Sequence, residues 1–207
     1  HCYGPHIFHT DRPRVWAYVN RFAEMIPFVL RVKATVRGNV YSLPVNLHTI
    51  NQYFGTAMGP QAARRFMAAQ AEGASDDREA DSFEAHALRH LGRTIYEAFF
   101  RGYTRKQWGI DPADLPASIL KRLPIRFDYN DNYFSHPWQA IPRDGYGAMV
   151  QRILDHPLIE VRLGCRFEDA RNASEQFAHV FYSGGIDRYF GFDLGRLGYR
   201  TLDFERT

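Results

Sequence analysis

The sequence predicts a mixed α/β fold, with α+β elements, in which a helical bundle is inserted between segments of mixed or antiparallel sheet. β-branched residues gather on both sides of a turn at residues 37–39, and a helical period of apolar residues dominates residues 47–121. Apolar and polar residues alternate again at residues 159–163. With 207 residues, of which 45% are apolar and 24% charged, the chain can bury a substantial core.

Three parts are expected along the chain. Residues 1–45 would form an initial segment with a β-hairpin, and residues 46–123 a helical subdomain with a lid at its end. Residues 124–207 would supply further mixed α/β sheet segments. This division follows the places where the hydrophobic period changes from that of strands to that of helices and back.

The first part should begin with a helix. Thr10 or Asp11 can cap it, Pro13 suits its first turn, and apolar residues recur at intervals of three and four as far as Ile26. The β-hairpin should follow, because residues 37–39 have turn chemistry and are flanked by strand-forming residues. A helix followed by a hairpin is therefore expected here.

The second part should contain several helices. Residues 60–71 are rich in helix formers, Asp81 and Glu84 have the spacing of a capping pair, and Gly102 lies where a stop signal is expected. One apolar stripe marks the buried face of the longest helix: Phe83, Ala87, Leu88, Leu91, Ile95 and Phe99.

Prolines separate this part from the next. Pro112, Pro116 and Pro124 exclude one continuous helix, and a long connection of this kind often belongs to a moving lid. Beyond them a short helix is expected at residues 146–154. Besides the alternating segment described above, a second strand is expected at residues 179–182.

Composition narrows the function classes. The chain has 26 Lys and Arg against 23 acidic residues, and a net charge of +3 is too small for a typical nucleic-acid-binding domain. No apolar run approaches the roughly 18 residues of a membrane span, and the first residues lack the features of a signal peptide, so a cytoplasmic location is expected. Cys2 and Cys165 are too few for a disulfide framework and are interpreted as reduced thiols.

Two pairs of histidines have spacings that occur in metal sites. His6 and His9 are three positions apart, and His86 and His90 are four apart on an expected helix. Neither pair has the glutamate pattern of a zinc hydrolase. A packed segment for the first pair and a solvated helix face for the second are the favoured interpretations, and no metal is expected.

Residues 96–108 combine rings with cations. Aromatic residues make up 15% of the chain, and several gather here. The rings are Phe99, Phe100, Tyr103 and Trp108, and the cations are Arg101, Arg105 and Lys106. Flat rings beside cations can stack on a base and neutralise phosphate. The same rings could instead fill the helical core, although the polar tips of Tyr and Trp favour partial exposure.

Further arginines could serve an anionic ligand. Arg122 and Arg126 flank Pro124 in the suspected lid, and Arg196 and Arg200 bracket the stretch GRLGYR. Arginine is well shaped for bidentate contact with a diphosphate, although a lone arginine more often forms a surface salt bridge. The sequence contains no glycine-rich phosphate loop and no nucleophile-elbow motif. The residues alone therefore predict a site for an aromatic, anionic ligand.

Five stretches together resemble the bacterial UDP-galactopyranose mutases. They are GPHIFHT, SLPVNLHTINQYF, TIYEAFFRGYTRKQW, LPASILKRLPIRFDYNDNYF and GRLGYRTLDFE. They cover the chain nearly end to end and follow one another in the family's order. One such stretch would be a weak signal, whereas five in order are specific.

The resemblance implies a flavin-dependent mutase fold and an isomerase with FAD as its cofactor. Such an enzyme interconverts UDP-galactopyranose and UDP-galactofuranose through a reduced-flavin–sugar adduct, and it serves galactofuranose biosynthesis. The protein's part is to orient cofactor and substrate and to stabilise the leaving diphosphate, so no side-chain nucleophile is required. The resemblance also implies UDP-galactose as the small-molecule substrate, a homodimer at full length, and no nucleic-acid or membrane partner.

The resemblance assigns roles to particular residues. The substrate-binding residues would be Phe99, Tyr103, Thr104, Trp108, Arg122, Tyr133 and Arg200. Tyr103 and Trp108 would line the uridine pocket, Arg122 would swing from the lid onto the diphosphate, and Arg200 would be its fixed partner. The catalytic residues would be these two arginines and His6. The residues flanking the flavin would be Pro5, His6, Ile7 and Phe8.

Departures from the family pattern leave alternatives open. The glycine-rich fingerprint with which the family usually opens is not among these residues, so most of the flavin site is expected outside them and these residues alone should be inactive. Gly185 stands where proline is usual, and Leu30 where a polar residue is common. The rival interpretations are a nucleotide-sugar-binding module without catalysis and another flavoenzyme related to the amine oxidases.

Overall fold

The computed structural model describes residues 6–71, 81–120, 125–169 and 177–199, with residues 201 and 203. The chain divides into two compact units. The first comprises His1–Ala17 and Met25–Ile141, and the second Tyr18–Glu24 and Pro142–Thr207. Helices and small antiparallel sheets together give the mixed α/β class that the sequence predicts. The boundaries expected at residues 45 and 123 stay a prediction.

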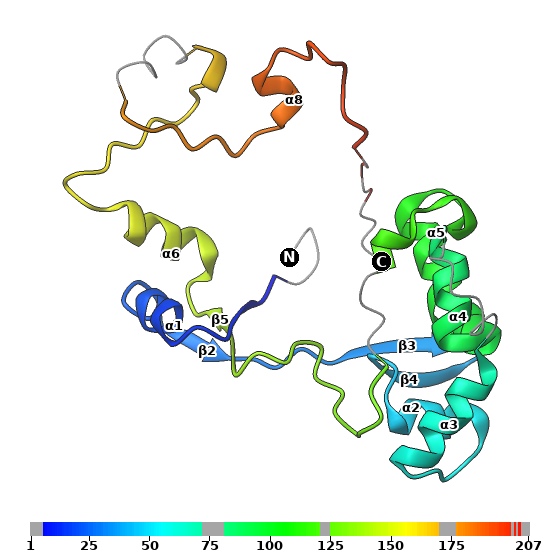
Figure 1. Cartoon of the computed structure of the whole chain (residues 1–207). Coiled ribbons are helices and arrows are strands. Elements are labelled where there is room, and N and C mark those ends of the chain that lie inside the picture. Colours follow the sequence, from blue (N-terminus) through cyan, green and yellow to red (C-terminus); the bar gives the residue numbers. More distant parts are fainter. Residues whose placement is uncertain are drawn as a thin grey trace. The chain divides into compact units, whose positions relative to one another are not determined.

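A three-stranded sheet lies in the first unit. Strands β1 (Phe8–Thr10), β5 (Trp138–Pro142) and β2 (Met25–Pro27) follow one another in the order β1-β5-β2, and β1 pairs antiparallel with β5. Helix α1 (Pro13–Val19) connects β1 to β2 (Figure 1). The predicted helix was too long, because Ile26 lies in β2 instead. That strand depends on pairing with distant residues, which the local period cannot reveal.

The predicted hairpin is confirmed. Strands β3 (Val32–Val36) and β4 (Asn39–Leu43) pair antiparallel, with Val36 opposite Asn39. Arg37 has φ 50° and Gly38 has φ 80°. Positive φ at both central residues is the geometry of a two-residue turn whose twist matches that of the strands. Local turn chemistry therefore sets the register of this ribbon.

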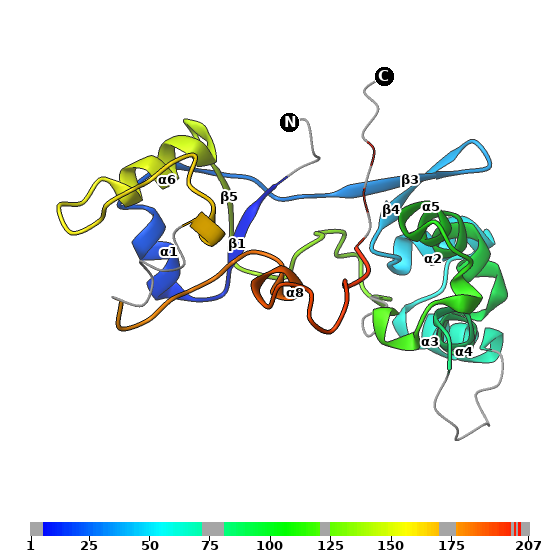
Figure 2. The same ribbon diagram turned by 90° about the horizontal axis from the view of Figure 1, so that it is seen from above.

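Helices cover the hairpin in the first unit, as Figures 1 and 2 show. They are α2 (Leu47–Phe54), α3 (Pro60–Gln70), α4 (Phe83–Ile95), the π-helix η1 (Tyr96–Arg101), α5 (Gly102–Trp108), and the 3₁₀ turns η2 (Pro112–Asp114) and η3 (Ala117–Leu120). Their shared core consists of Tyr41, Val45, Ile50, Met67, Phe83, Ala87, Leu91, Ile95, Tyr96, Phe99 and Leu115. The predicted apolar stripe of α4 thus supplies much of the core.

Two predicted helix signals were wrong. The cap of α4 is Ser82, whose Oγ accepts a hydrogen bond from the N–H of Ala85 at 3.2 Å, whereas Asp81 lies one position too early. Gly102 has helical backbone angles and begins α5 directly after the π-helix, so it does not end a helix. The helix ends at Gly109, whose φ of 67° is the left-handed conformation that favours glycine.

The described residues of the second unit contain ion pairs and helical segments. Arg143 binds Glu24 through two hydrogen bonds of 2.6 Å each, which ties the segment before β2 to the chain after β5. Helix α6 (Gly145–Leu154) confirms the predicted short helix, and α8 (Ile186–Tyr189) follows later. Among the residues described here, none of the helices is long and apolar enough to cross a membrane.

The two strands predicted for this unit are absent from the described residues. Residues 159–163 and 179–182 form no ladder, and the side chains of Leu163 and Phe181 are 90% and 96% exposed. A strand needs a partner for its backbone N–H and C=O groups, and an alternating pattern cannot supply one. The alternation predicted strand propensity, which is realised only where a neighbouring strand is present. Cys165 is a free, exposed thiol, while Cys2 lies outside the described residues.

Candidate nucleotide-sugar site

The segment of rings and cations lies on η1 and α5, which continue α4 without a break. Stretches of π-helix are rare and occur frequently at functional sites. Phe99 is 8% exposed, and its ring lies 5.3 Å from the ring of Tyr41 and 5.4 Å from that of Tyr53. Phe99 is therefore a core residue, and its predicted contact with a ligand stays a prediction.

Helix α5 separates buried from exposed candidates. Thr104 is 4% exposed, and Trp108, four residues later on the same face, is half-buried against the core. Tyr103 is 71% exposed. A half-buried indole and an exposed phenol on one helix offer ring surface to a ligand while the helix stays anchored.

Cations lie on the same helical segment as these rings. Arg101, Arg105 and Lys106 are exposed, and the last two lie in the final turn of α5. Positive charge is favourable at a helix C-terminus, so Arg105 and Lys106 stabilise the end of α5. The helix therefore presents stacking surface and charge together, as an aromatic base with phosphates requires.

A long loop, residues 125–134, is fixed to the start of α2. The N–H of Leu47 donates to the carbonyl of Asp128 at 2.9 Å, and the N–H of Arg126 donates to the carbonyl of Val45 at 2.9 Å. These backbone bonds hold the loop like a short strand pairing. The loop carries Tyr133, one of the predicted substrate-binding residues, so these bonds fix the backbone that leads to it.

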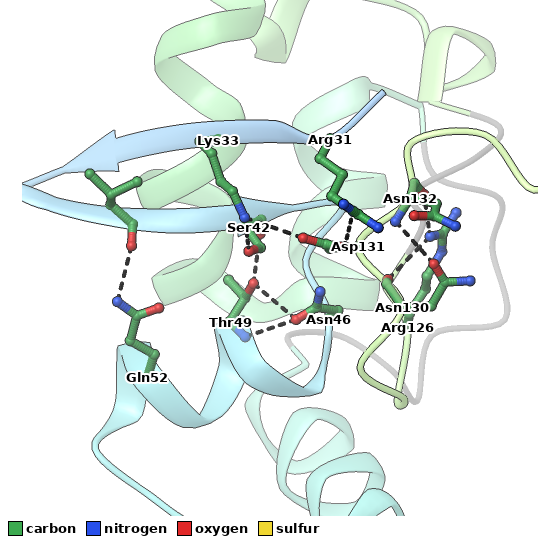
Figure 3. A network of polar contacts seen from close by, with 11 residues as sticks. Arg31, Lys33, Ser42, Asn46, Thr49, Gln52, Arg126, Asn130, Asp131 and Asn132 are labelled. Carbon is green, nitrogen blue, oxygen red and sulfur yellow. Dashed lines mark hydrogen bonds and ion pairs between the residues drawn. The ribbon is translucent and has the colours of Figure 1, made fainter. Parts of the chain in front are cut away.

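Asp131 joins this loop to the hairpin (Figure 3). Its carboxylate lies 3.0 Å from Nε of Arg31 and 3.2 Å from Nζ of Lys33, which also donates to Oγ of Ser42 at 2.6 Å. Partial burial opposes ionisation, but the hydrogen bond from Lys33 and the charges of Lys33 and Arg31 together lower the pKa of Asp131. The aspartate is therefore held as a carboxylate.

A second group of polar contacts in Figure 3 fixes α2 on β4. Oδ1 of Asn46 caps the helix by accepting from the N–H of Thr49 at 3.0 Å, and Oγ1 of Thr49 donates to the carbonyl of Ser42 at 2.6 Å. Nε2 of Gln52 donates to the carbonyl of Val40 at 3.0 Å. Because Tyr41 of the same strand contacts Phe99, the hairpin supports both the loop and the ring-bearing helices.

Replacing Asp131 by asparagine should make stability less dependent on pH. The folded-state pKa is lowered, so the carboxylate stabilises the fold above its unfolded pKa of about 3.9, and this is lost as pH falls through the folded pKa. Urea midpoints of wild type and Asp131→Asn should therefore differ near neutral pH and converge in acid. Asp114→Asn, an exposed control in the same unit, should follow the wild type. A constant difference at every pH would contradict this account.

Tyr133 is 49% exposed at the end of the loop. Its N–H donates to the carbonyl of Leu30 at 2.8 Å, and the guanidinium of Arg126 donates to the carbonyls of Asn130 and Asn132. The backbone before the phenol is thus held from both sides. The backbone that carries this exposed phenol is therefore fixed.

Of the expected flavin-flanking residues, Phe8 begins β1, and His6 and Ile7 directly precede it. His6 is exposed, Ile7 and Phe8 are half-buried, and the ring of Phe8 stacks on that of Trp16 at 6.2 Å. Within the described sheet, β1 is an edge strand, so one side of its backbone faces no other strand of that sheet. Backbone groups on the outer edge of a strand are able to hydrogen-bond to a ligand. Pro5 lies outside the described residues.

The structure therefore brings some predicted residues together and leaves others undescribed. Tyr103, Thr104 and Trp108 share one helix, whereas Arg122 and Arg200 lie outside the described residues. The binding of the loop to the hairpin, through Arg31, Lys33 and Asp131, was not predicted from the sequence. The stretch DYNDN carried a usable signal, because Asp and Asn side chains often bond to backbone N–H groups two residues later.

The described residues hold no group of three or more metal-ligating side chains. His86 and His90 stack with their ring centroids 4.3 Å apart, and Nδ1 of His90 lies 2.9 Å from the carbonyl of His86. The pair is accounted for by contacts along its own helix. Arg196, another predicted anion ligand, lies 4.1 Å over the ring of Phe192 in the second unit.

Comparison with known proteins supports the resemblance to the UDP-galactopyranose mutases. A family model described as UDP-galactopyranose mutase matches residues 98–207. A probable UDP-galactopyranose mutase of Klebsiella pneumoniae is 55% identical over 206 residues, which cover 100% of this chain and 53% of that relative. A dTDP-fucopyranose mutase of Escherichia coli is 50% identical, covering 100% of this chain and 55% of the relative. A UDP-galactopyranose mutase of Mycoplasma pneumoniae is 30% identical, covering 99% of this chain and 54% of the relative.

The chain spans about half the length of the curated relatives it matches. The family match begins at Ala98 within η1, so it includes α5 with Tyr103 and Trp108, the loop with Tyr133, and the stretch GRLGYR. Of these segments, α5 and the loop carry the exposed rings of Tyr103 and Tyr133. The chain belongs to the UDP-galactopyranose mutase family.

Proposed function

We propose that this chain supplies much of the nucleotide-sugar pocket of an enzyme that interconverts UDP-galactopyranose and UDP-galactofuranose. One observation carries the proposal: within the family match, α5 presents exposed Tyr103 and half-buried Trp108 among exposed cations. A uracil ring needs a flat surface, and the diphosphate needs positive charge close by. The cytoplasm and a homodimer are the proposed location and assembly of the full-length protein.

The rings would bind the base. Tyr103 and Trp108 would line the uridine pocket, since both expose ring surface, and the buried side chains of Phe99 and Thr104 would shape the pocket from beneath. The ring contacts of Phe99 with Tyr41 and Tyr53 would keep this wall rigid. A rigid wall reduces the ordering that binding would otherwise require.

The arginines would act on the diphosphate. Arg122 and Arg200, expected from two different segments, would form bidentate contacts with its oxygens, while the phenol of Tyr133 would donate a further hydrogen bond. As the bond from the sugar to UDP breaks, negative charge grows on the departing oxygen. Donors already in place stabilise that charge more than they stabilise the bound substrate, which lowers the barrier.

His6 and β1 would hold the flavin. The exposed imidazole and the open strand edge fit the rim of its ring system, with Ile7 and Phe8 as apolar support. When bound, reduced FAD would supply the electron pair that displaces UDP from the anomeric carbon. The chain's own residues orient the sugar, exclude water and stabilise the leaving group, so the absence of a nucleophile motif is consistent with this division of work.

Titration of UDP and dTDP into the full-length, flavin-loaded and reduced protein tests the proposal, followed by chromatography of UDP-galactopyranose and UDP-galactofuranose. Preference for UDP with turnover is the expected result. Preference for dTDP would favour a dTDP-sugar substrate, for which the 50% identical relative is a reason. Binding without turnover would favour a nucleotide-sugar-binding module. Binding of neither nucleotide would favour a flavoenzyme related to the amine oxidases.

Replacing Trp108 by alanine should weaken UDP binding by about 10- to 100-fold, since stacking on one base contributes about 1–3 kcal/mol. Calorimetric titration measures the change. Because Trp108 also packs against the core, the matched variant is Trp108→Phe, which keeps a flat ring at the same position. Phenylalanine should retain most of the affinity. Equal losses in both variants would point to a packing role instead.

A further inference from the structure

Two imidazoles meet in the first unit apart from the ring-bearing helix. His9 lies in β1 and His136 lies just before β5, and their Nδ1 atoms are 2.7 Å apart. At this distance one Nδ1 carries a proton and donates to the lone pair of the other. A proton on both atoms would point two N–H groups at each other. The contact therefore requires that at least one of the two imidazoles stays neutral.

A stack of rings connects this contact to Tyr133. His9 lies on Phe134 with ring centroids 3.6 Å apart and an interplanar angle of 19°, and Phe134 meets Tyr133 edge-on at 4.9 Å and 86°. The side chains of Tyr133, Phe134, His9 and His136 thus form a continuous ring ladder. The ladder runs from Tyr133, which is proposed to contact the diphosphate, to β1, which is proposed to flank the flavin.

The backbone beneath the ladder is held by separate contacts. Nε2 of Gln139 donates to the carbonyls of Phe134 at 3.3 Å and His136 at 2.9 Å, and the N–H of Tyr133 donates to Leu30. None of these bonds depends on the charge of an imidazole. Breaking the histidine contact should therefore loosen the rings without unfolding the segment.

The charges around the ladder are few. Burial first, and then the charge of the neighbouring His136 imidazole, lower the pKa of His9, and no carboxylate, lysine or arginine of the described residues contributes to this shift. The residues packed on the pair from the loop and from β5, Phe134 and Gln139, are neutral. The state of the contact thus depends on the protons of the two imidazoles themselves.

We propose that the ring ladder is a proton-sensitive device that positions the Tyr133 phenol for the diphosphate of a nucleotide sugar, with His136 as a positioning residue. The proposal rests on the proposed function. While one imidazole is neutral, His9 is held against Phe134, and Phe134 limits the rotation of Tyr133. When both imidazoles are charged they repel, the stack opens, and Tyr133 is no longer fixed. Nucleotide-sugar affinity should then fall as the pH falls.

The test measures UDP-galactose binding to the full-length, flavin-loaded protein between about pH 7.5 and about pH 5, where histidine changes its charge. UDP-galactose is the probe because each of its phosphates carries one ester and one anhydride bond, which leaves no proton that titrates near pH 6, whereas the terminal phosphate of UDP has a pKa of about 6. The wild-type dissociation constant should rise about fivefold or more on acidification, the lower end of usual coupling between sites. In His136→Asn, whose amide can hydrogen-bond without titrating, it should rise less than about twofold.

His48→Asn, an exposed histidine on α2 in the same unit, is the control and should follow the wild type. A parallel rise in wild type and His136→Asn, or no rise in either, would overturn the proposal. Failure of the wild type to bind at about pH 7.5 would count against the proposed function instead. In that case the ring-ladder proposal is tested by the imidazole ¹⁵N chemical shifts of His9. These shifts should titrate at lower pH in the wild type than in His136→Asn. Identical His9 titrations would overturn it.

Discussion

Replacing Gly92 by alanine should destabilise the protein by about 2–4 kcal/mol, a large effect for one methyl group. Gly92 interrupts α4 with φ 70° and ψ 161°, a conformation that side chains disfavour. A Cβ at this position would lie 2.3 Å from the carbonyl oxygen of Gln70 and 2.8 Å from its carbonyl carbon. Both atoms belong to the backbone at the end of α3, so relief requires moving one helix against another.

Gly102→Ala is the matched control. Gly102 has φ −63° and ψ −45°, and a Cβ there would meet no atom within 4 Å. Alanine should therefore be tolerated and should stabilise the helix by up to about 1 kcal/mol, because it restricts the unfolded chain. Urea midpoints of the full-length variants measure both changes. A Gly92→Ala variant as stable as the wild type would show that α3 and α4 do not approach each other as closely as described.

Gly92 also illustrates what sequence can and cannot predict. The apolar stripe of α4 was predictable because side chains three and four apart share a face, and the hairpin because Arg37 and Gly38 carry the turn locally. The kink at Gly92 was not predictable, since its cause is the approach of Gln70 from another helix. The glycine gave no sign of its role because a single glycine within a helical pattern is common.

Strands depended on distant partners in the same way. The alternation at residues 159–163 matches that of a strand, yet the described residues give it no ladder. Conversely, Met25–Pro27 forms strand β2 where the helical period continues, because it lies in one sheet with β5 more than a hundred residues later. Local propensity decides secondary structure only where tertiary contacts do not compete.

The candidate site shows the same division. Spacing identified a segment of rings and cations, and that segment lies on one helix, but spacing could not tell that Phe99 is 8% exposed and Tyr103 71% exposed. The π-helical turn at η1 changes which side chains face the core, and no local signal predicts it. The histidine pair was considered as His6 with His9, whereas the partner of His9 is His136. A contact between residues 127 positions apart in the sequence is seen only in the folded structure.

Replacing Arg200 by alanine should reduce kcat by about 100-fold or more, the usual loss when one donor to a developing negative charge is removed. Arg200 lies outside the described residues, so the expectation rests on the family resemblance of GRLGYRTLDFE and on the proposed function. The flavin content of the purified protein should be unchanged, because this arginine is assigned to the diphosphate. Turnover of UDP-galactofuranose and flavin absorbance measure the two quantities on one preparation.

Two further variants separate charge from geometry at this position. Arg200→Lys keeps the positive charge but loses the planar fork, so its kcat should lie between those of the wild type and Arg200→Ala. Arg196→Ala, four residues earlier, removes a guanidinium that lies over Phe192, and it should leave kcat within about twofold of the wild type. If Arg196→Ala and Arg200→Ala lost activity equally, the segment would contribute general positive charge rather than one placed donor. An unchanged kcat in Arg200→Ala would remove this residue from the proposed diphosphate contacts and leave Arg122 and Tyr133 as the donors to be tested.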